Sequence, residues 1–371
     1  MNQDPFKEYM RDSEPDKRKK GYAWRTGIGL QAVDGLKTSD YLLHTAVRNI
    51  EGEITFQEAN ALLQSYYEAH PSSDFEDRTE EADKVSIRIA ELLSEKAFGF
   101  TPQEYISIHR KLFAGIYSHA GRLRDYNITK QEWVLDGASV LYGSATELRA
   151  TLDYDFSEER NFSYKGLSMD EMIHHLAVFL SRLWQIHIFG EGNTRVTAVF
   201  FIKYLRSLGF EATNDVFAEN AWYFRNALVR ANYNDLKKGI HETTAFLERF
   251  LRNLLLDEHH PLRNRTLHIA WRPDEAIKPD IETEKPDIGK TKPDIGAAKP
   301  DIMAEFLPKT VENIRKLREA FPEGEVFGRT EVMKMLGLKT SGASELLMKL
   351  RKSGIVEAVS GLGKGKYRFI L

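Results

Sequence analysis

The stretch that decides the fold is His187-Ile188-Phe189-Gly190-Glu191-Gly192-Asn193-Thr194-Arg195. It is a polar, glycine-containing loop between two segments whose apolar residues recur at helical spacing. Those residues are Ile173, Leu176, Leu180 and Leu183 before the loop, and Val196, Phe200, Tyr204 and Leu208 after it. Gly209 then follows as an expected C-cap. We therefore expect a mainly α-helical domain with this loop at the N-terminus of a helix.

The loop has the composition of an anion site. Gly190 and Gly192 permit backbone conformations and close approaches that larger residues forbid. The following helix offers unpaired amides and the positive end of its dipole. Arg195 can donate a fork of hydrogen bonds to the same anion, and Glu191 can hold a magnesium ion that bridges phosphates. Together these groups indicate a nucleotide polyphosphate.

His187 stands just before this anion loop. An imidazole accepts a proton near neutral pH, so His187 can deprotonate a hydroxyl that attacks phosphorus. Phe189 is expected to bury its ring beneath the loop and to fix the loop in place, because positioning of the reactants dominates phosphoryl-type transfer.

The loop resembles the Fic-family motif His-Pro-Phe-x-Asp/Glu-Gly-Asn-Gly-Arg-x-x-Arg, which lies between two helices of an all-α domain; here it reads HIFGEGNTRVTA. The resemblance extends over roughly residues 100–255. It implies transfer of AMP from ATP, with Mg²⁺, to a Ser, Thr or Tyr hydroxyl of a protein, and self-modification is left open. His187 would be the base, and Glu191 the metal ligand. The nucleotide contacts would come from Phe189, Gly190, Glu191, Gly192, Asn193, Thr194 and Arg195.

Three positions depart from the motif. Ile188 replaces the proline, Thr194 replaces the third glycine, and Ala198 stands where the second arginine would contact the γ-phosphate. Loss of that arginine weakens the expected grip on the γ-phosphate, and it leaves open which phosphate-linked group is transferred.

Two other interpretations of the loop remain. His187 and Glu191, four residues apart, could be an ordinary solvent-facing pair in a glycine-containing turn between helices. They could also bind zinc together with His174 or His175, although the sequence has no HExxH pattern.

The segment Arg48-Asn49-Ile50-Glu51-Gly52-Glu53-Ile54 resembles the inhibitory motif Ser/Thr-x-x-x-Glu-Gly/Asn of one Fic class. Glu51 matches the inhibitory glutamate, whereas Val47 replaces the serine and Ala198 replaces the arginine that pairs with the glutamate. We expect retained but altered inhibition, with Glu51 repelling the γ-phosphate or pairing with Arg195. The alternative is an ordinary charge on a helix surface.

Two further segments resemble parts of the same domain. Gly121-Arg122-Leu123-Arg124 is similar to the segment before the family's flap. Within residues 131–143, the order apolar, Asp136-Gly137, apolar predicts a short hairpin, which resembles the flap that aligns a target protein by strand addition. Aromatic and amide groups suited to adenine follow at Trp222, Tyr223, Asn226 and Asn232, of which Asn226 and Asn232 are the predicted contacts.

The C-terminal part begins with a repeat. Lys-Pro-Asp-Ile recurs at 278, 285, 292 and 299, and its prolines exclude helix and favour an extended linker. Beyond it, helix-like segments at 311–320, 330–336 and 341–353 precede apolar strands around a glycine-rich stretch, 361–365, which predicts a winged helix-turn-helix.

This C-terminal part is locally basic. From Gly328 onward the sequence has nine basic and three acidic residues. DNA is therefore an expected partner, and a protein-interaction role is the alternative. The basic residues are Arg329, Lys334, Lys339, Lys349, Arg351, Lys352, Lys364, Lys366 and Arg368. Ser341, Ser344 and Lys349 lie near the start of the expected recognition helix. A rival function is therefore a DNA-binding regulator whose Fic-like domain senses nucleotide.

Composition sets the remaining expectations. The chain has 371 residues, 42% hydrophobic and 29% charged, no cysteine and a net charge of −3, so we expect a cytoplasmic protein that does not cross a membrane. The net charge argues against coating nucleic acid over the whole surface. The expected divisions are a helical region over 1–99, the catalytic domain over 100–255, a linker over 256–303 and the winged helix over 304–371; homo-oligomerisation is left open.

Overall fold

The computed structural model describes residues 5–12, 14–71, 78–211, 216–272, 292–293, 313–314, 316–318, 320–321, 325–338, 340–352, 355–359 and 366–369. It divides into two compact units, residues 1–297 and 298–371. The larger unit is built from helices around an apolar core, as the sequence predicts.

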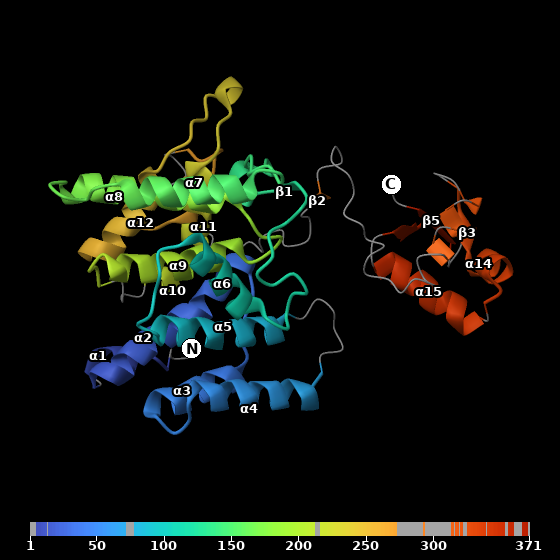
Figure 1. The fold of residues 1–371 in the computed structure, drawn as a ribbon, viewed down its shortest axis with the longest axis horizontal. Helices are drawn as coiled ribbons and strands as arrows, with labels where there is room; N and C mark the ends of the chain where they lie inside the picture. Colours follow the sequence, from blue (N-terminus) through green and yellow to red (C-terminus); the bar gives the residue numbers. More distant parts are fainter. Residues whose placement is uncertain are drawn as a thin grey trace. The chain divides into compact units, whose positions relative to one another are not determined.

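The elements of the larger unit follow in chain order (Figure 1). Its α-helices are α1 (Lys7–Asp12), α2 (Pro15–Gly29), α3 (Asp40–Glu51), α4 (Phe56–Ala69), α5 (Thr79–Ser94), α6 (Pro102–Phe113), α7 (Leu148–Asn161), α8 (Met169–Ile186), α9 (Asn193–Ser207), α10 (Val216–Glu219), α11 (Ala221–Ala231) and α12 (Ala245–Leu256). Its 3-10 helices are η1 (Leu30–Asp34), η2 (Trp133–Leu135), η3 (Leu236–Lys238) and η4 (Asn264–Leu267), and its strands are β1 (Ile128–Thr129) and β2 (Lys292–Pro293). Within the described ranges, no helix is both long and apolar enough to cross a bilayer.

Helices α8 and α9 flank the loop at 187–192 and pack against each other. A reciprocal capping box starts α8: the Ser168 hydroxyl accepts from the Glu171 amide, and the Glu171 carboxylate accepts from the Ser168 amide. The predicted apolar stripe of α8 is buried. Helix α9 is buried along nearly its whole length, and Gly209 follows it with φ +92°, as a C-terminal glycine requires.

The crossing of α2 and α5 positions the N-terminal region against α9. At the crossing, the Ser86 hydroxyl donates to the Gly27 carbonyl at 3.2 Å. A Cβ on Gly27 would lie 2.5 Å from the Ser86 carbonyl oxygen, so only glycine fits there without a shift. The close approach of α2 to α5 places η1 against α5, α9 and α11. The end of η1 therefore lies at the start of α9.

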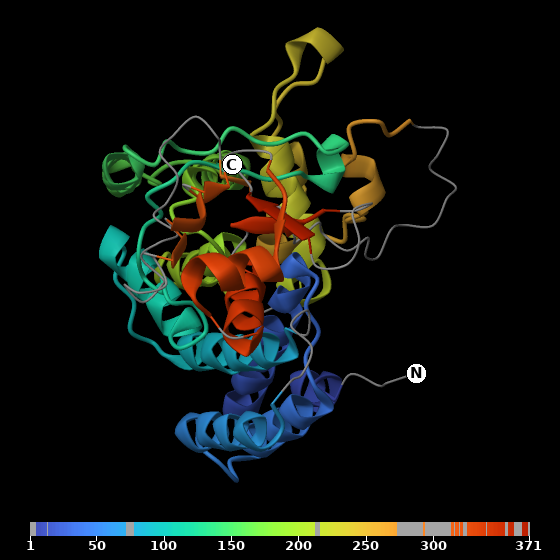
Figure 2. The same cartoon turned by 90° about the vertical axis from the view of Figure 1, so that its right-hand side faces the viewer.

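Helices α3 and α4 form a pair at the edge of the larger unit that lies away from α8 (Figures 1 and 2). Thr55 begins α4 with a complete capping box to Glu58. The C-terminal end of α3, which carries Glu51, therefore lies far from the loop at 187–192.

The hairpin expected over residues 131–143 does not form. Trp133–Leu135 is a 3-10 helix that ends at Asp136, with φ +54°, and the Glu132 amide closes the turn by donating to the Ala138 carbonyl at 3.0 Å. Neighbouring Val134 and Leu135 are both buried, whereas successive residues of a strand point to opposite faces. Burial of adjacent side chains thus favours the 3-10 turn over the strand.

A strand pair lies just before this turn. β1 pairs antiparallel with β2, and Thr129 lies opposite Lys292 in the register. β2 belongs to the repeat region, most of which lies outside the described residues. The residues from the end of α12 to 272 pack on the larger unit, where Asn264 and Leu267 of η4 are buried. The chain up to residue 272 is therefore part of the larger unit.

The smaller unit has its own core. It contains β3 (Phe327–Gly328), α14 (Arg329–Leu336), α15 (Thr340–Lys352), β4 (Val356–Ala358) and β5 (Lys366–Phe369). Gly337, with φ +63°, ends α14, and the sheet order is β3-β5-β4 with antiparallel pairs. The glycine-rich stretch 361–365 lies outside the described residues. Helices α14 and α15 and strands β4 and β5 follow in the order expected from the sequence, whereas β3 was not expected. The helix expected over 311–320 lies partly outside the described residues, and the winged-helix assignment stays a prediction.

Candidate active site

His187 lies at the C-terminal end of α8 in the left-handed conformation, with φ +51° and ψ +56°. Arg124 holds the backbone there: its Nε donates to the His187 carbonyl at 2.7 Å, and one Nη donates to the Ile186 carbonyl at 3.3 Å. The Arg124 amide also donates to the Ile188 carbonyl at 2.9 Å. A cation at a helix C-terminus is favourable, so Arg124 stabilises a conformation that a non-glycine residue rarely adopts.

The His187 ring is buried and only 3% exposed. Its Nδ1 lies 3.3 Å from the Trp184 carbonyl oxygen, which can only accept, so Nδ1 carries the proton. Nε2 is buried and has no hydrogen-bond partner among the described residues. Burial first, and then the charge of Lys130, hold the pKa of His187 well below its ordinary value. His187 is thus neutral, with a free lone pair on Nε2.

The anion loop is closed by one side chain. Asn193 accepts from the Phe189 amide at 3.0 Å and donates to the Phe189 carbonyl at 2.7 Å. Gly192 has φ +74°, and its carbonyl accepts the first intrahelical bond of α9, from the Val196 amide. The amides of Asn193, Thr194 and Arg195 precede that bond, as the sequence predicts for an anion-binding helix terminus.

A layer of rings supports the loop from below. Phe189 is fully buried and stacks on His109, with ring centroids 3.7 Å apart. The Gly121 amide donates to His109 Nδ1 at 2.8 Å, so Nε2 carries the proton and donates to the Glu191 carbonyl at 3.2 Å. Burial lowers the pKa of His109 to about 3. His109 is therefore a neutral ring that fixes the loop backbone.

The two glycines of the loop are required by their neighbours. A Cβ on Gly192 would lie 2.4 Å from ring atoms of Phe113, and one on Gly190 would lie 2.7 Å from the Tyr126 hydroxyl. Gly192 therefore excludes a larger residue, because the Phe113 ring is buried and the φ of Gly192 is +74°, whereas a side chain at Gly190 would require the Tyr126 hydroxyl to shift.

Each departure from the family motif has a structural role. The Thr194 hydroxyl accepts from the indole nitrogen of Trp184 at 3.0 Å, which ties α9 to α8. Ile188 and Ala198 are fully buried. Ala198 is fully buried, so an arginine could not occupy this position without displacing its neighbours.

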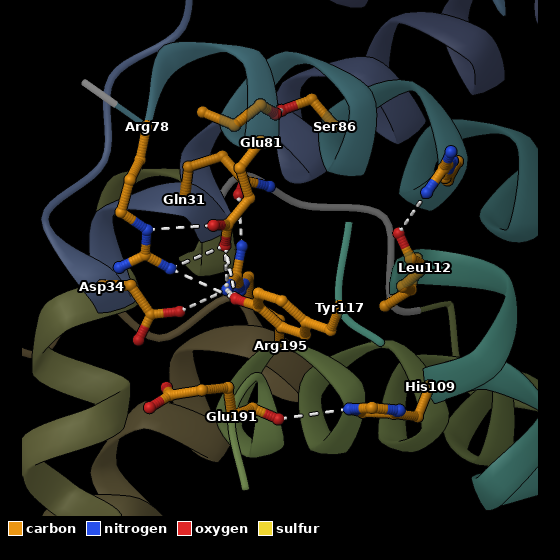
Figure 3. Close-up of polar contacts among 12 residues, drawn as sticks. Gln31, Asp34, Arg78, Glu81, Ser86, His109, Leu112, Tyr117, Glu191 and Arg195 are labelled. Atoms are coloured by element: carbon orange, nitrogen blue, oxygen red, sulfur yellow. Dashed lines mark hydrogen bonds and ion pairs between the residues drawn. The ribbon is translucent and has the colours of Figure 1, made fainter. Parts of the chain in front are cut away.

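Arg195 is fully buried, and both of its terminal nitrogens are engaged (Figure 3), whereas its Nε has no hydrogen-bond partner among the described residues. One Nη lies 2.8 Å from Glu81 and 2.8 Å from Asp34 Oδ2, and the other donates to Gln31 at 3.0 Å. Tyr117 completes the cluster, 3.2 Å from the guanidinium. The sequence analysis did not find these partners, because they come from η1, α5 and the loop after α6.

Glu51 does not take part in this cluster. Its carboxylate accepts from Lys17 at 2.5 Å and from Tyr9 at 2.6 Å, at the exposed end of α3. The expected pairing of Glu51 with Arg195 is therefore wrong, because Asp34 and Glu81 hold that arginine instead.

The residues expected at adenine are tied to the protein. Asn226 donates to Asn264 at 2.9 Å, and Asn232 donates to the Ser181 and Leu228 carbonyls. Tyr223 donates to the Phe246 carbonyl at 3.2 Å. The buried Oδ1 of Asn226 and the buried Nε1 of Trp222 have no hydrogen-bond partner among the described residues.

A buried ion pair next to His187 was not found from the sequence. Arg225 of α11 pairs with Glu132 at 2.7 Å, and Glu132 accepts from the Tyr142 hydroxyl at 3.0 Å. The Tyr142 ring lies 4.4 Å from the His187 ring. Arg225 and Glu132 thus fix the Tyr142 side chain, which packs against His187.

The zinc alternative finds no geometric support. His174 pairs with Glu248 and His175 with Glu159, each at 2.7 Å. Among the residues that the structure describes, no three His, Asp or Glu side chains gather as a metal site.

Comparison with known proteins now adds to this geometry. The model of the Fic/DOC family matches residues 99–205, which include α6, α8 and most of α9. Residues 99–205 belong to the Fic/DOC family. The matched region includes the whole loop at 187–192. No curated protein matches the sequence.

Two solved structures are similar to this chain. One is the N-terminal FIC domain of the Bep8 protein from Bartonella sp. 1-1C, at 19% identity and a TM-score of 0.38, covering 50% of this chain and 88% of that one. The other is a Fic family protein from Desulfovibrio desulfuricans G20, at 12% identity and a TM-score of 0.41, covering 96% of this chain and 88% of that one.

Acidification is expected to destabilise the fold through His109 and His187. Burial lowers the pKa of both rings, so below about pH 6.5 the unfolded chain binds more protons than the folded one. The contribution is fully present above that pH and is lost as the pH falls. Between pH 7 and 5.5, the unfolding free energy of the protein is expected to fall by about 1 kcal/mol for each of the two rings.

Urea unfolding of the wild type and His109→Gln at both pH values measures the share of His109. The wild type should lose about 1 kcal/mol more than the variant on acidification. Equal losses would show that His109 is not a neutral buried ring in the folded protein.

Proposed function

We propose that this protein transfers AMP from ATP to a hydroxyl group of a protein. The observation that carries the proposal is a neutral, buried His187, its Nε2 without a partner among the described residues, directly before an anion-binding loop at the start of α9. A base next to a polyphosphate site is what attack of a hydroxyl on phosphorus requires.

In the proposed reaction, the loop amides and Arg195 bind phosphate, and the target hydroxyl attacks the α-phosphorus. His187 Nε2 takes the hydroxyl proton while the bond from the α-phosphorus to the bridging oxygen breaks, and pyrophosphate leaves. Arg124 and Trp184 fix the ring so that Nε2, and not Nδ1, is the accepting atom. Because Nε2 has no exposed surface, a covering group has to move before a hydroxyl reaches it.

Glu191 is the proposed ligand of Mg²⁺. It lies inside the anion loop, its backbone is held by His109, and a magnesium site needs only one or two carboxylates besides the phosphates. When bound, the ion would neutralise charge on the phosphates. Asn226, with its unpartnered Oδ1, is the proposed contact to the base.

The target protein is proposed to dock along β1 rather than along a hairpin at 131–143. β1 accepts an antiparallel strand, β2, in this structure, and strand addition is a common way to align an extended segment.

Intact-protein mass after incubation with Mg-ATP tests the transfer. The wild type, alone or with added candidate targets, should yield an AMP adduct that His187→Ala loses, because its base is gone. His174→Ala is the matched control, since His174 is exposed and pairs with Glu248, and it should retain the adduct.

An adduct that persists in His187→Ala would contradict the role of the base. An adduct of different mass, formed from another nucleotide donor, would contradict AMP as the group transferred.

DNA binding is the second candidate function, favoured by the smaller unit. Helix α15 exposes Lys349 and Arg351, and α14 exposes Arg329 and Lys334. Exposed cations on two neighbouring helices suit phosphate contacts.

Gel-shift titrations of the full chain at several salt concentrations test this candidate. Binding of DNA should weaken as the salt concentration rises. The double variant Lys349→Glu/Arg351→Glu should abolish binding, whereas Lys237→Glu on η3 should not. Equal binding by both variants would place any DNA contact outside α15.

A further inference from the structure

Asp34 is brought into the active site by the N-terminal region. It ends η1, which packs against α5, α9 and α11, and Gly35 follows with φ +65°, so the chain turns away at once. Figure 3 shows the Asp34 carboxylate directed at the guanidinium of Arg195, and Oδ2 lies 2.8 Å from one of its nitrogens. A carboxylate thus stands at the arginine that the anion loop provides.

Further cations face the same carboxylate. Burial raises the pKa of Asp34, but the charges of Arg195, Lys130, Arg225 and Arg78 outweigh it and lower the pKa. These cations come from α9, the segment after β1, α11 and the start of α5. Convergence of cations from four parts of the chain is typical of a polyanion site.

Two of these cations also act on the proposed base. Lys130 and Arg225 also act on His187, and Arg225 is connected to it through Glu132 and Tyr142, whose ring lies 4.4 Å from the imidazole. Because Asp34 pairs with Arg195 in the first turn of α9, directly after the loop at 187–192, it lies next to the proposed phosphate site.

The two carboxylates at Arg195 differ in how firmly they are held. Glu81 is buried, accepts from Arg78 at 2.7 and 2.9 Å, and accepts from Tyr117 at 2.6 Å in addition to Arg195. The Asp34 side chain keeps 23% exposure and meets Arg195 through one oxygen. Glu81 is fixed structure, whereas Asp34 is the carboxylate that another anion can replace.

We propose that the four cations around Asp34 bind the terminal phosphates of a nucleoside triphosphate, and that Asp34 is a resident anion which those phosphates displace. Arg78 and Lys130 then supply the charge that Ala198 cannot. The inference rests on the proposed function, because it assumes that the rest of the nucleotide lies on the loop at 190–195. In this proposal the inhibitory carboxylate is that of Asp34, at the end of η1, and not that of Glu51.

Titration calorimetry with α,β-methylene-ATP and with AMP tests the inference, since the methylene bridge prevents turnover. Asp34→Asn should bind the triphosphate about ten-fold or more tightly than the wild type, because removing a like charge from the site favours the phosphates. Affinity for AMP should be unchanged. Glu51→Gln is the matched control and should leave both affinities as in the wild type.

Lys130→Met provides a second test that does not depend on the stability of Asp34→Asn. This variant should weaken binding of the triphosphate at least about five-fold and leave the affinity for AMP unchanged, because it removes a phosphate contact. If both ligands bind but neither variant changes the ratio of their affinities, the inference is wrong and the proposed function survives. If neither ligand binds to any variant, the nucleotide-transfer proposal itself fails.

Discussion

The buried guanidinium of Arg195 is the constraint on which the rest of the structure depends. A charge without solvent is costly unless it is paired and hydrogen-bonded, and here Asp34, Glu81, Gln31 and Tyr117 pair the two terminal nitrogens of the guanidinium. These partners come from the N-terminal helices and from the loop after α6. Residues of the family-matched region and residues of the N-terminal region are thus joined at this arginine.

The same cluster explains why the loop is already formed. Tyr117 stacks on Phe113, which lies under the Arg195 guanidinium and contacts Gly192, while Phe189 and His109 form the layer beside it. Asn193 then closes the loop on itself. Packing and pairing thus fix the loop, so binding of the proposed nucleotide would require little ordering of its backbone.

Local sequence determines part of this site and long-range contacts determine the rest. The α8–loop–α9 arrangement and the buried Phe189 could be predicted, because helical periodicity and glycine spacing are visible within twenty or so residues. Gln31 and Glu81 lie 164 and 114 residues from Arg195, and no local pattern marks them as its partners.

Two other differences have physical causes of the same kind. The alternation that suggested a hairpin at 131–143 was overridden by joint burial of Val134 and Leu135. Glu51 matched a motif, yet packing of α3 on α2 and α4 at the edge of the unit directs it to Lys17. A motif match fixes residue type but not the position of the helix that carries it.

The most direct test of the central claim is a double-mutant cycle between Arg195 and Glu81, using Arg195→Met, Glu81→Gln and the double variant in urea unfolding. Each single change should cost about 3 kcal/mol or more because it leaves a buried partner unpaired. The account predicts a coupling of about 2 to 3 kcal/mol, so that the double variant loses much less than the sum. Additive losses, with a coupling below about 0.5 kcal/mol, would contradict the claim that this pair holds the site together.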